Sequence, residues 1–284
     1  MGENPLKERR LTRMDLIFFT KSLKGLSAEE TAEKAREIGV DGLDLTVRGG
    51  YCVNSGDFET TLAPAMEVFA NAGLSVPLVT LEGSWTDPSQ QPVRDLAAAC
   101  AGVGIPYLKL GYWGWDPGEG FWPGLDRVRS DLAGFAEIAA ETGVCFLLHN
   151  HSGHRYGSHA TGGMLALEGI DPDRVGLYID PGHLALEGEL IAMAVDIARP
   201  SLRMVAAKNV RYRFVANGRD SHWDDEWVQL SEGLQDWPGT IRALKAAGYD
   251  GPISLHGQYS GTDGVDDVLA RASRDVDYLR ELIG

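Results

Sequence analysis

A repeated junction between helix and strand constrains the fold of this chain more than any other feature. An amphipathic stretch ends in a glycine and a short apolar run follows, as in residues 37–42 before Leu43 and residues 246–251 before Pro252. Glycine suits the left-handed C-cap of a helix, and a short apolar run suits a buried strand. This alternation of helix and strand predicts βαβ units and a parallel sheet.

The number of such units predicts the architecture. The pattern places eight strands near residues 14–20, 41–47, 76–81, 106–111, 144–149, 175–180, 202–207 and 252–257. Eight units in 284 residues fit a single closed (β/α)₈ TIM barrel of α/β class, which typically takes about 250 residues. The alternative is an open doubly wound sheet, but no glycine-rich nucleotide-binding motif follows the first run. We expect one domain over residues 1–284, with residues 1–13 as a polar N-terminal extension.

The composition of the chain restricts the kinds of partner that it can bind. A net charge of −15 disfavours binding to nucleic acids and anionic membranes. The three cysteines show no zinc-binding spacing, which indicates a reducing compartment. No apolar stretch approaches the roughly 20 residues that span a bilayer, and residues 1–13 lack the apolar core of a signal peptide. We therefore expect a cytoplasmic protein that acts on a small-molecule substrate. The sequence leaves open whether the chain forms a homo-oligomer.

Three of the apolar runs end in side chains that can bind metal. His149 follows the fifth predicted strand, Asp180 the sixth and His256 the eighth. The carboxyl ends of barrel strands meet at one mouth, so these side chains should converge. Two imidazoles and a carboxylate suit Mn²⁺, Fe²⁺, Co²⁺ or Zn²⁺ better than Mg²⁺. We predict a divalent metal site here; the alternative is a hydrogen-bonded cluster without metal.

Strand alternation directs further polar side chains to the same mouth. Because a buried charge is costly unless it is paired or bound, such a set predicts a functional site. Lys208 and Arg48 could hold anionic or carbonyl oxygens, or stabilise an enediolate. The predicted catalytic residues are His151, His183, Lys208 and Glu82, and the predicted substrate-binding residues are Arg48, Lys109, Trp113 and Trp115. The two tryptophans follow the fourth strand, where sugar stacking and packing against helices are equally good interpretations.

The same motifs carry a resemblance to a known superfamily. They are residues 41–48, His149-Asn150-His151, Asp180-Pro181-Gly182-His183, Lys208-Asn209 and residues 251–256. In their order and position the chain resembles the sugar phosphate isomerase/epimerase superfamily of xylose isomerase-like TIM barrels, over nearly its whole length. Members typically bind Mn²⁺ or a similar ion through Glu, Asp, His and Glu on strands five to eight. Asp180 matches the Asp, and His183 matches the histidine of the D-x-x-H motif that contacts substrate.

The other metal positions depart from that pattern. His149 and His256 stand where the two Glu would be, and Ala206 stands in place of the metal-binding His. The missing glutamates are the usual acid and base of the epimerases, so their loss puts the two-carboxylate mechanism in doubt.

The resemblance implies a metal-dependent isomerase or epimerase of carbohydrate metabolism. Such an enzyme would act on a sugar, keto-sugar or cyclitol by proton abstraction next to a carbonyl. Alternatives are a dehydratase or lyase acting on keto-sugars or 3-keto-glycosides, and a non-catalytic sugar-binding barrel or partner-dependent subunit. An endonuclease of the same superfamily is disfavoured, because the chain is acidic and has no basic stripe.

Overall fold

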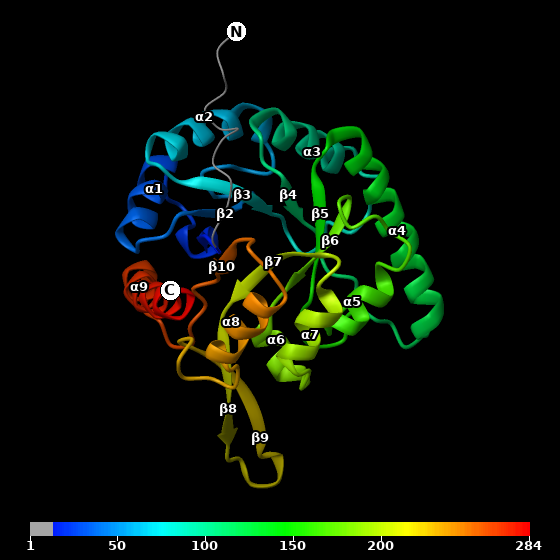
Figure 1. Ribbon diagram of the computed structural model, residues 1–284, viewed down its shortest axis with the longest axis vertical. Helices are drawn as coiled ribbons and strands as arrows, with labels where there is room; N and C mark the ends of the chain where they lie inside the picture. Colours follow the sequence, from blue (N-terminus) through cyan, green and yellow to red (C-terminus); the bar gives the residue numbers. More distant parts are fainter. Residues whose placement is uncertain (1–13) are drawn as a thin grey trace.

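A closed barrel of parallel strands forms the centre of the molecule (Figure 1). The computed structural model describes residues 14–284, and the predicted N-terminal extension lies outside them. Around the barrel the strands run β1, β2, β3, β4, β5, β6, β7 and β10, and β10 pairs with β1 again. Their bounds are β1 (Leu16–Phe19), β2 (Gly42–Thr46), β3 (Ser75–Thr80), β4 (Tyr107–Lys109), β5 (Cys145–His149), β6 (Val175–Ile179), β7 (Leu202–Ala207) and β10 (Ile253–Leu255). All eight predicted strands, and the (β/α)₈ fold, are confirmed.

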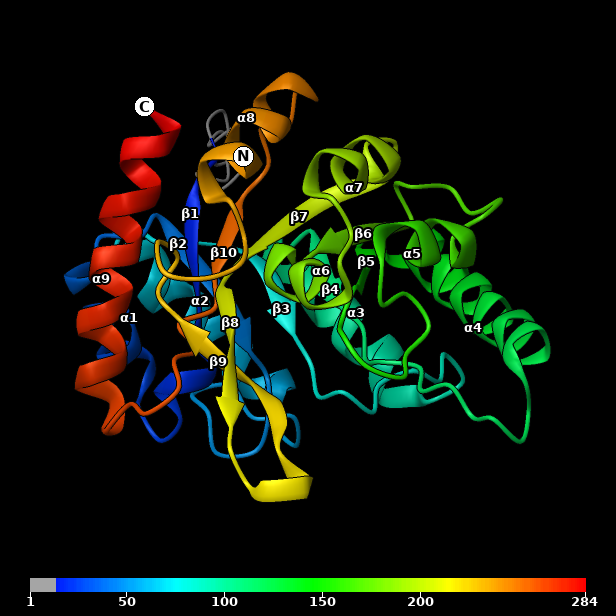
Figure 2. The ribbon, with the colours of Figure 1, turned by 90° about the horizontal axis from the view of Figure 1, so that it is seen from below.

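Helices surround the barrel in both ribbon views (Figures 1 and 2). They are α1 (Ala28–Glu37), α2 (Phe58–Asn71), α3 (Gln91–Val103), α4 (Phe121–Thr142), α5 (Ala160–Ala166), α6 (Pro181–Glu187), α7 (Ile191–Ala198), α8 (Trp237–Ala246) and α9 (Gly264–Ile283), with a 3₁₀ turn η2 (Thr20–Leu23). The expected glycine caps are present: Gly104 and Gly143 adopt left-handed conformations with φ of 81° and 77°. No helix within residues 14–284 is long and apolar enough to span a membrane.

The first and last units of the chain close the ring. Phe18 of β1 pairs with Leu255 of β10 on one side and with Leu43 of β2 on the other. Helix α9 lies beside α1 in both views. The Arg280 guanidinium of α9 forms a 2.9 Å ion pair with Asp41, which also accepts a hydrogen bond from the backbone N–H of Leu16. These contacts join the two ends of the barrel sequence.

The side chains of the strands divide into two buried layers. In β5, Phe146 and Leu148 belong to the large core between strands and helices, whereas Leu147 belongs to a separate cluster inside the barrel. This is the alternation that the sequence predicts. The inner cluster consists of Ile17, Leu78, Cys145, Leu147, Tyr178, Met204 and Ala206. It fills the barrel interior, so polar side chains gather only beyond it, at the strand ends.

A two-stranded hairpin follows the seventh barrel strand, in a segment where the sequence pattern places no strand. Strands β8 (Asn209–Val215) and β9 (His222–Val228) pair antiparallel, with Phe214 opposite Trp223 and a short 3₁₀ turn η3 (Gly218–Asp220) at the tip. The hairpin projects away from the barrel in both views (Figures 1 and 2). Its strands are mostly exposed. They therefore lack the buried apolar face on which strand prediction depends, which is why the sequence pattern does not show these two strands.

Asn209 anchors this hairpin to the barrel. Its fully buried amide donates to the carbonyl oxygens of Leu230, at 2.7 Å, and Gln235, at 3.0 Å. Its Oδ1 accepts from the backbone N–H groups of Val210 and Gln235, both at 2.9 Å. Buried polar groups that are fully hydrogen-bonded hold a segment in one arrangement. Asn209 therefore fixes the chain immediately after Lys208.

Candidate active site

The buried carboxylate of Asp180 lies at the centre of the polar cluster. It follows β6 and caps helix α6, where it accepts a hydrogen bond from the backbone N–H of His183. Its Oδ2 lies 3.2 Å from Lys208 Nζ, 3.5 Å from His149 Nε2 and, at 4.0 Å, near His256 Nδ1. Burial alone would raise its pKa, but the charge of Lys208 and the hydrogen bond from the His183 backbone N–H hold that pKa below the ordinary value. Asp180 is therefore ionised at neutral pH and is the counterion of this cluster.

The Lys208 ammonium has three polar neighbours, one of which is the Asp180 carboxylate at ion-pair distance. Besides Asp180, its ammonium contacts His183 Nε2 at 2.7 Å and the Gln258 side-chain oxygen at 3.3 Å. It also lies 4.2 Å from the ring centre of Trp227, in a cation–π contact. Burial lowers its pKa while Asp180 opposes that shift. The contact with Gln258 is the longest of the three, so a substrate oxygen could most easily replace Gln258.

The imidazoles of the cluster are neutral at pH 7. Burial, reinforced by Lys109 and Lys208, holds the pKa of His149 well below its ordinary value, and His256 is shifted in the same direction. Burial lowers the pKa of His151 to about 4. Neutral imidazoles can act as bases or ligands, so their protonation state suits proton transfer.

The tautomer of His151 is fixed, and its Nε2 has no hydrogen-bond partner among residues 14–284. Its Nδ1 lies 3.0 Å from the carbonyl oxygen of Ser152. A carbonyl can only accept, so Nδ1 carries the proton and Nε2 carries the lone pair. His183 differs, because its two nitrogens contact Lys208 and the Ser152 hydroxyl. Of the two predicted histidines, His151 is therefore the one available as a general base.

A buried network lies beneath the cluster. The Tyr178 hydroxyl contacts His256 Nε2 at 2.8 Å and Asp44 Oδ2 at 3.3 Å. Asp44 also accepts hydrogen bonds from Thr80 and Ser254. Burial raises its pKa to about 6 despite these bonds. The network orients the His256 ring so that its Nδ1 faces the site.

The predicted metal ligands His149, Asp180 and His256 are brought together, but a cation already lies among them. A divalent ion would bind about 2 Å from Asp180 Oδ2, and the Lys208 ammonium lies 3.2 Å from that same oxygen. Two cations would then share one buried carboxylate. Within residues 14–284 no group of three or more His, Cys, Asp and Glu is arranged to hold a metal. As arranged here, the residues do not fit a divalent ion, and metal binding stays a prediction of the sequence.

Two cavities with shared lining residues lie at this end of the barrel. The inner cavity, of about 150 Å³, is lined by Phe19, Lys21, Arg48, Thr80, Gly83, Lys109, Tyr112, His149, His151, Lys208, His256 and Gln258. The outer cavity, of about 450 Å³, is lined by His151, Ser152, His183, Lys208, Asp225, Trp227, Gly257, Gln258, Tyr259, Ser260 and Thr262. They share His151, Lys208 and Gln258. The base candidate and the ammonium thus lie where a ligand would reach both.

Three predicted site residues lie elsewhere. Glu82 is exposed and lines neither cavity. Trp113 is buried, donates to Asp131 of α4 at 2.8 Å and packs against Phe135, so it serves helix packing. Trp115 is 38% exposed and contacts the ring of His154 outside the cavities. The predicted roles of these residues are therefore not supported, whereas Arg48 and Lys109 do line the inner cavity.

Several residues that line or support the cavities were not assigned to the site from the sequence. Alternation places Asp44 inside the barrel, but the sequence assigned it no role. Tyr178 was missed because its neighbours on the strand are apolar. Trp227 was missed because the hairpin was not expected. Lys21 was missed because it follows the first strand in a short turn that gives no signal of its own.

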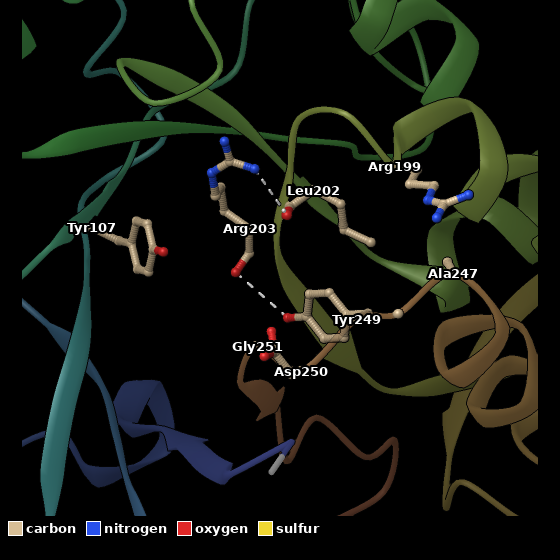
Figure 3. A pocket seen from close by; sticks show the side chains of 9 residues that line it. Tyr107, Arg199, Leu202, Arg203, Ala247, Tyr249, Asp250 and Gly251 are labelled. Carbon is tan, nitrogen blue, oxygen red and sulfur yellow. Dashed lines mark hydrogen bonds between the residues drawn. The ribbon is translucent and has the colours of Figure 1, made fainter. Parts of the chain in front are cut away.

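A further cavity of about 240 Å³ lies at the opposite end of the barrel (Figure 3). It is lined at the starts of β4 and β7 by residues that include Tyr107 and Arg203. Two of its polar groups have partners: Arg203 pairs with Asp173 at 2.8 Å, and the Tyr249 hydroxyl donates to the carbonyl of Pro252 at 2.6 Å. This end of a barrel contributes to stability rather than to chemistry.

Comparison with known proteins agrees with this architecture. Residues 32–282 match the family model described as xylose isomerase-like TIM barrel. Inosose dehydratase from Geobacillus thermodenitrificans is 26% identical over 167 residues, which is 56% of this chain and 55% of that enzyme. Inosose dehydratase from Lacticaseibacillus casei is 24% identical over 140 residues, which is 47% of each. The chain therefore spans about half the length of the curated relatives it matches.

Solved structures share the fold at low identity. D-psicose 3-epimerase from Clostridium cellulolyticum H10, solved with D-tagatose, superposes with a TM-score of 0.73 at 15% identity over 95% of this chain and 99% of that one. 3-Keto-D-glucoside 4-epimerase from E. coli gives a TM-score of 0.70 at 16% identity, over 95% and 100%. A xylose isomerase-like barrel from Mycobacterium smegmatis in complex with magnesium gives 0.69 at 14%, over 95% and 96%.

Proposed function

The chain belongs to the xylose isomerase-like TIM barrel family, and we propose that it is an enzyme that removes a proton next to the carbonyl group of a keto-sugar or cyclitol. One observation carries this proposal: a charge-balanced ammonium and a free imidazole share the same cavities. Lys208 is paired with Asp180, and His151 presents a nitrogen lone pair. Proton abstraction next to a carbonyl needs a base and a positive charge for the oxygen that becomes an anion.

The proposed step uses only these groups. The substrate carbonyl oxygen replaces Gln258 beside the Lys208 ammonium. His151 Nε2 takes the proton from the neighbouring carbon, and the C–H electrons form the C=C bond of an enediolate whose negative oxygen faces Lys208. Delivery of a proton from water to the opposite face of that carbon gives an epimer, and His151 then loses its proton to water. Return of the His151 proton to the former carbonyl carbon, with the hydroxyl proton moving from one oxygen to the other, gives an isomer. No step is assigned to a metal.

A dehydratase is the second candidate, because curated relatives of this chain are inosose dehydratases. The first half of the reaction would be the same. The enediolate would then re-form the carbonyl, and a C=C bond would form to the next carbon as the C–O bond of its hydroxyl group breaks. That hydroxyl would take the proton held by His151 and leave as water. The two candidates therefore differ in product and share the proton abstraction.

Deuterium exchange tests the shared step. Keto-sugars, inososes and 3-keto-glycosides are incubated with the protein in D₂O, and loss of the proton next to the carbonyl is followed by NMR. We expect exchange with at least one of them, and a loss of about 10²–10⁴-fold in His151→Asn. His222→Asn, at an exposed hairpin position, is the matched control and should keep full activity. Binding without exchange would favour a non-catalytic barrel.

Metal dependence is tested separately. Because the Lys208 ammonium lies at the Asp180 carboxylate, we expect the purified protein to carry much less than one divalent ion per chain by elemental analysis. We also expect EDTA treatment to leave the exchange rate unchanged. One Mn²⁺, Zn²⁺, Co²⁺ or Fe²⁺ per chain, removed by EDTA together with activity, would instead support the metal site that the sequence predicts at His149, Asp180 and His256.

A further inference from the structure

The inner cavity carries a concentration of positive charge. Four of its lining residues are basic, namely Lys21, Arg48, Lys109 and Lys208, and none is an Asp or Glu. The chain as a whole has a net charge of −15. The basic residues of the cavity therefore do not reflect the overall charge of the protein. They are concentrated at the place that a substrate would occupy.

Three of these cations lack a carboxylate partner. None of the ion pairs among the described residues includes Lys21, Arg48 or Lys109, whereas Lys208 is paired with Asp180. Arg48 donates to the carbonyl of Leu81 at 2.6 Å, and its Nε is buried without a hydrogen-bond partner among the described residues. Lys109 donates to the carbonyl of Leu110 at 3.0 Å. These partners are neutral, so the positive charge of Arg48 and Lys109 is not balanced by them.

The unbalanced cations affect one another. Burial lowers the pKa of Lys21, and the charge of Arg48 lowers it further. The pKa of Lys109 is lowered to about 7 by burial, then by Arg48, with Lys208 and Lys21 in the same direction. Asp44, which lies beneath the cavity and does not line it, acts in the opposite direction. At pH 7 Lys109 is therefore about half protonated, and the single carboxylate of Asp44 does not balance it together with Arg48 and Lys21.

We propose that the inner cavity binds the anionic group of a charged substrate, a carboxylate or a phosphate, through Arg48, Lys109 and Lys21. This inference rests on the proposed function, since it assigns the substrate class of the same site. Charge-assisted hydrogen bonds to anionic oxygens would balance the cations and occupy the unpartnered Nε of Arg48. A neutral sugar would leave that charge uncompensated inside the cavity. The substrate is thus a keto-sugar acid or a keto-sugar phosphate.

Binding of simple anions tests this without turnover. Isothermal titration calorimetry at constant ionic strength compares gluconate, inorganic phosphate and the neutral polyol glucitol. We expect gluconate or phosphate to bind at least about tenfold more tightly than glucitol. Tighter binding of gluconate would identify a carboxylate, and tighter binding of phosphate would identify a phosphate ester.

Substitutions of cavity residues show which side chains bind the anion. Arg48→Gln should weaken anion binding about tenfold and leave glucitol binding unchanged. Lys21→Met, at a more exposed position, should weaken anion binding in the same sense and serves if Arg48→Gln fails to fold. Arg219→Gln, at the hairpin tip, is the control and should bind as the wild type does. Equal affinity for all three ligands, or unchanged anion binding in the variants at both Arg48 and Lys21, would overturn the proposal.

The anion-binding test and the deuterium-exchange test can fail independently of each other. Exchange of a neutral keto-sugar in D₂O without anion binding would overturn the anionic substrate and leave proton abstraction standing. Anion binding that depends on Arg48, with no exchange on any keto-sugar acid or phosphate, would support the anion site and count against the enzyme.

Discussion

Lys208→Met is expected to lower kcat/KM for the exchange reaction by about 10³-fold, equivalent to about 4 kcal/mol of transition-state stabilisation. Methionine keeps the length and apolar contacts of the side chain and removes its charge. The enediolate oxygen would then form without a cation beside it, because the ammonium 3.2 Å from Asp180 is gone. Most of the loss should appear in kcat, since the negative charge develops in the transition state.

The measurement is the initial rate of deuterium exchange at several substrate concentrations. Lys24→Met is the matched control, because Lys24 is exposed and lines neither cavity. It should change neither kcat nor KM. If Lys208→Met retained the wild-type kcat, another group would stabilise the oxygen and the proposed role of Lys208 would be wrong.

Asp180→Asn is expected to lower the free energy of unfolding by about 3–5 kcal/mol, because it leaves a buried ammonium without its counterion. Asparagine has nearly the same shape and is also a good helix N-cap, so the start of α6 should persist. Urea denaturation followed by circular dichroism gives the difference. The double variant with Lys208→Met should recover much of the loss, since removing both charges is far less costly than removing one.

The pH dependence of this effect follows from the pKa of Asp180. Its pKa in the folded protein is lowered, so its contribution to stability is complete above the unfolded-state value of about 3.9. The contribution is lost as the pH falls through the folded-state pKa. The difference between wild type and Asp180→Asn should therefore narrow below about pH 4. A constant difference across that range would show that the loss arises from packing and not from charge.

Much of the barrel was predictable, since it depends on local rules. Glycine caps and short apolar runs define each unit, and alternation along β5 places Leu147 inside and Phe146 against the helices. The convergence of His149, Asp180 and His256 also follows, because parallel strands end at one mouth.

What the sequence could not show depends on side-chain contacts between distant segments. Nothing local distinguishes a tryptophan that stacks on sugar from Trp113, which bonds to a carboxylate on α4. The position of Lys208 is also not a local property. Its ammonium lies 3.2 Å from the Asp180 carboxylate, which was assigned to a metal from the sequence. This distance determines whether an ammonium or a metal ion is the partner of that carboxylate.

Asn209 has a consequence for how this barrel could change during evolution. Its four hydrogen bonds end the rigid part of the chain directly after Lys208. Most of the hairpin beyond it is exposed, yet the hairpin returns to place Trp227 against Lys208. Mutations, insertions and deletions in the hairpin can therefore alter the wall of the outer cavity while the ammonium keeps its place. New substrate preferences could arise in this segment without a new catalytic centre.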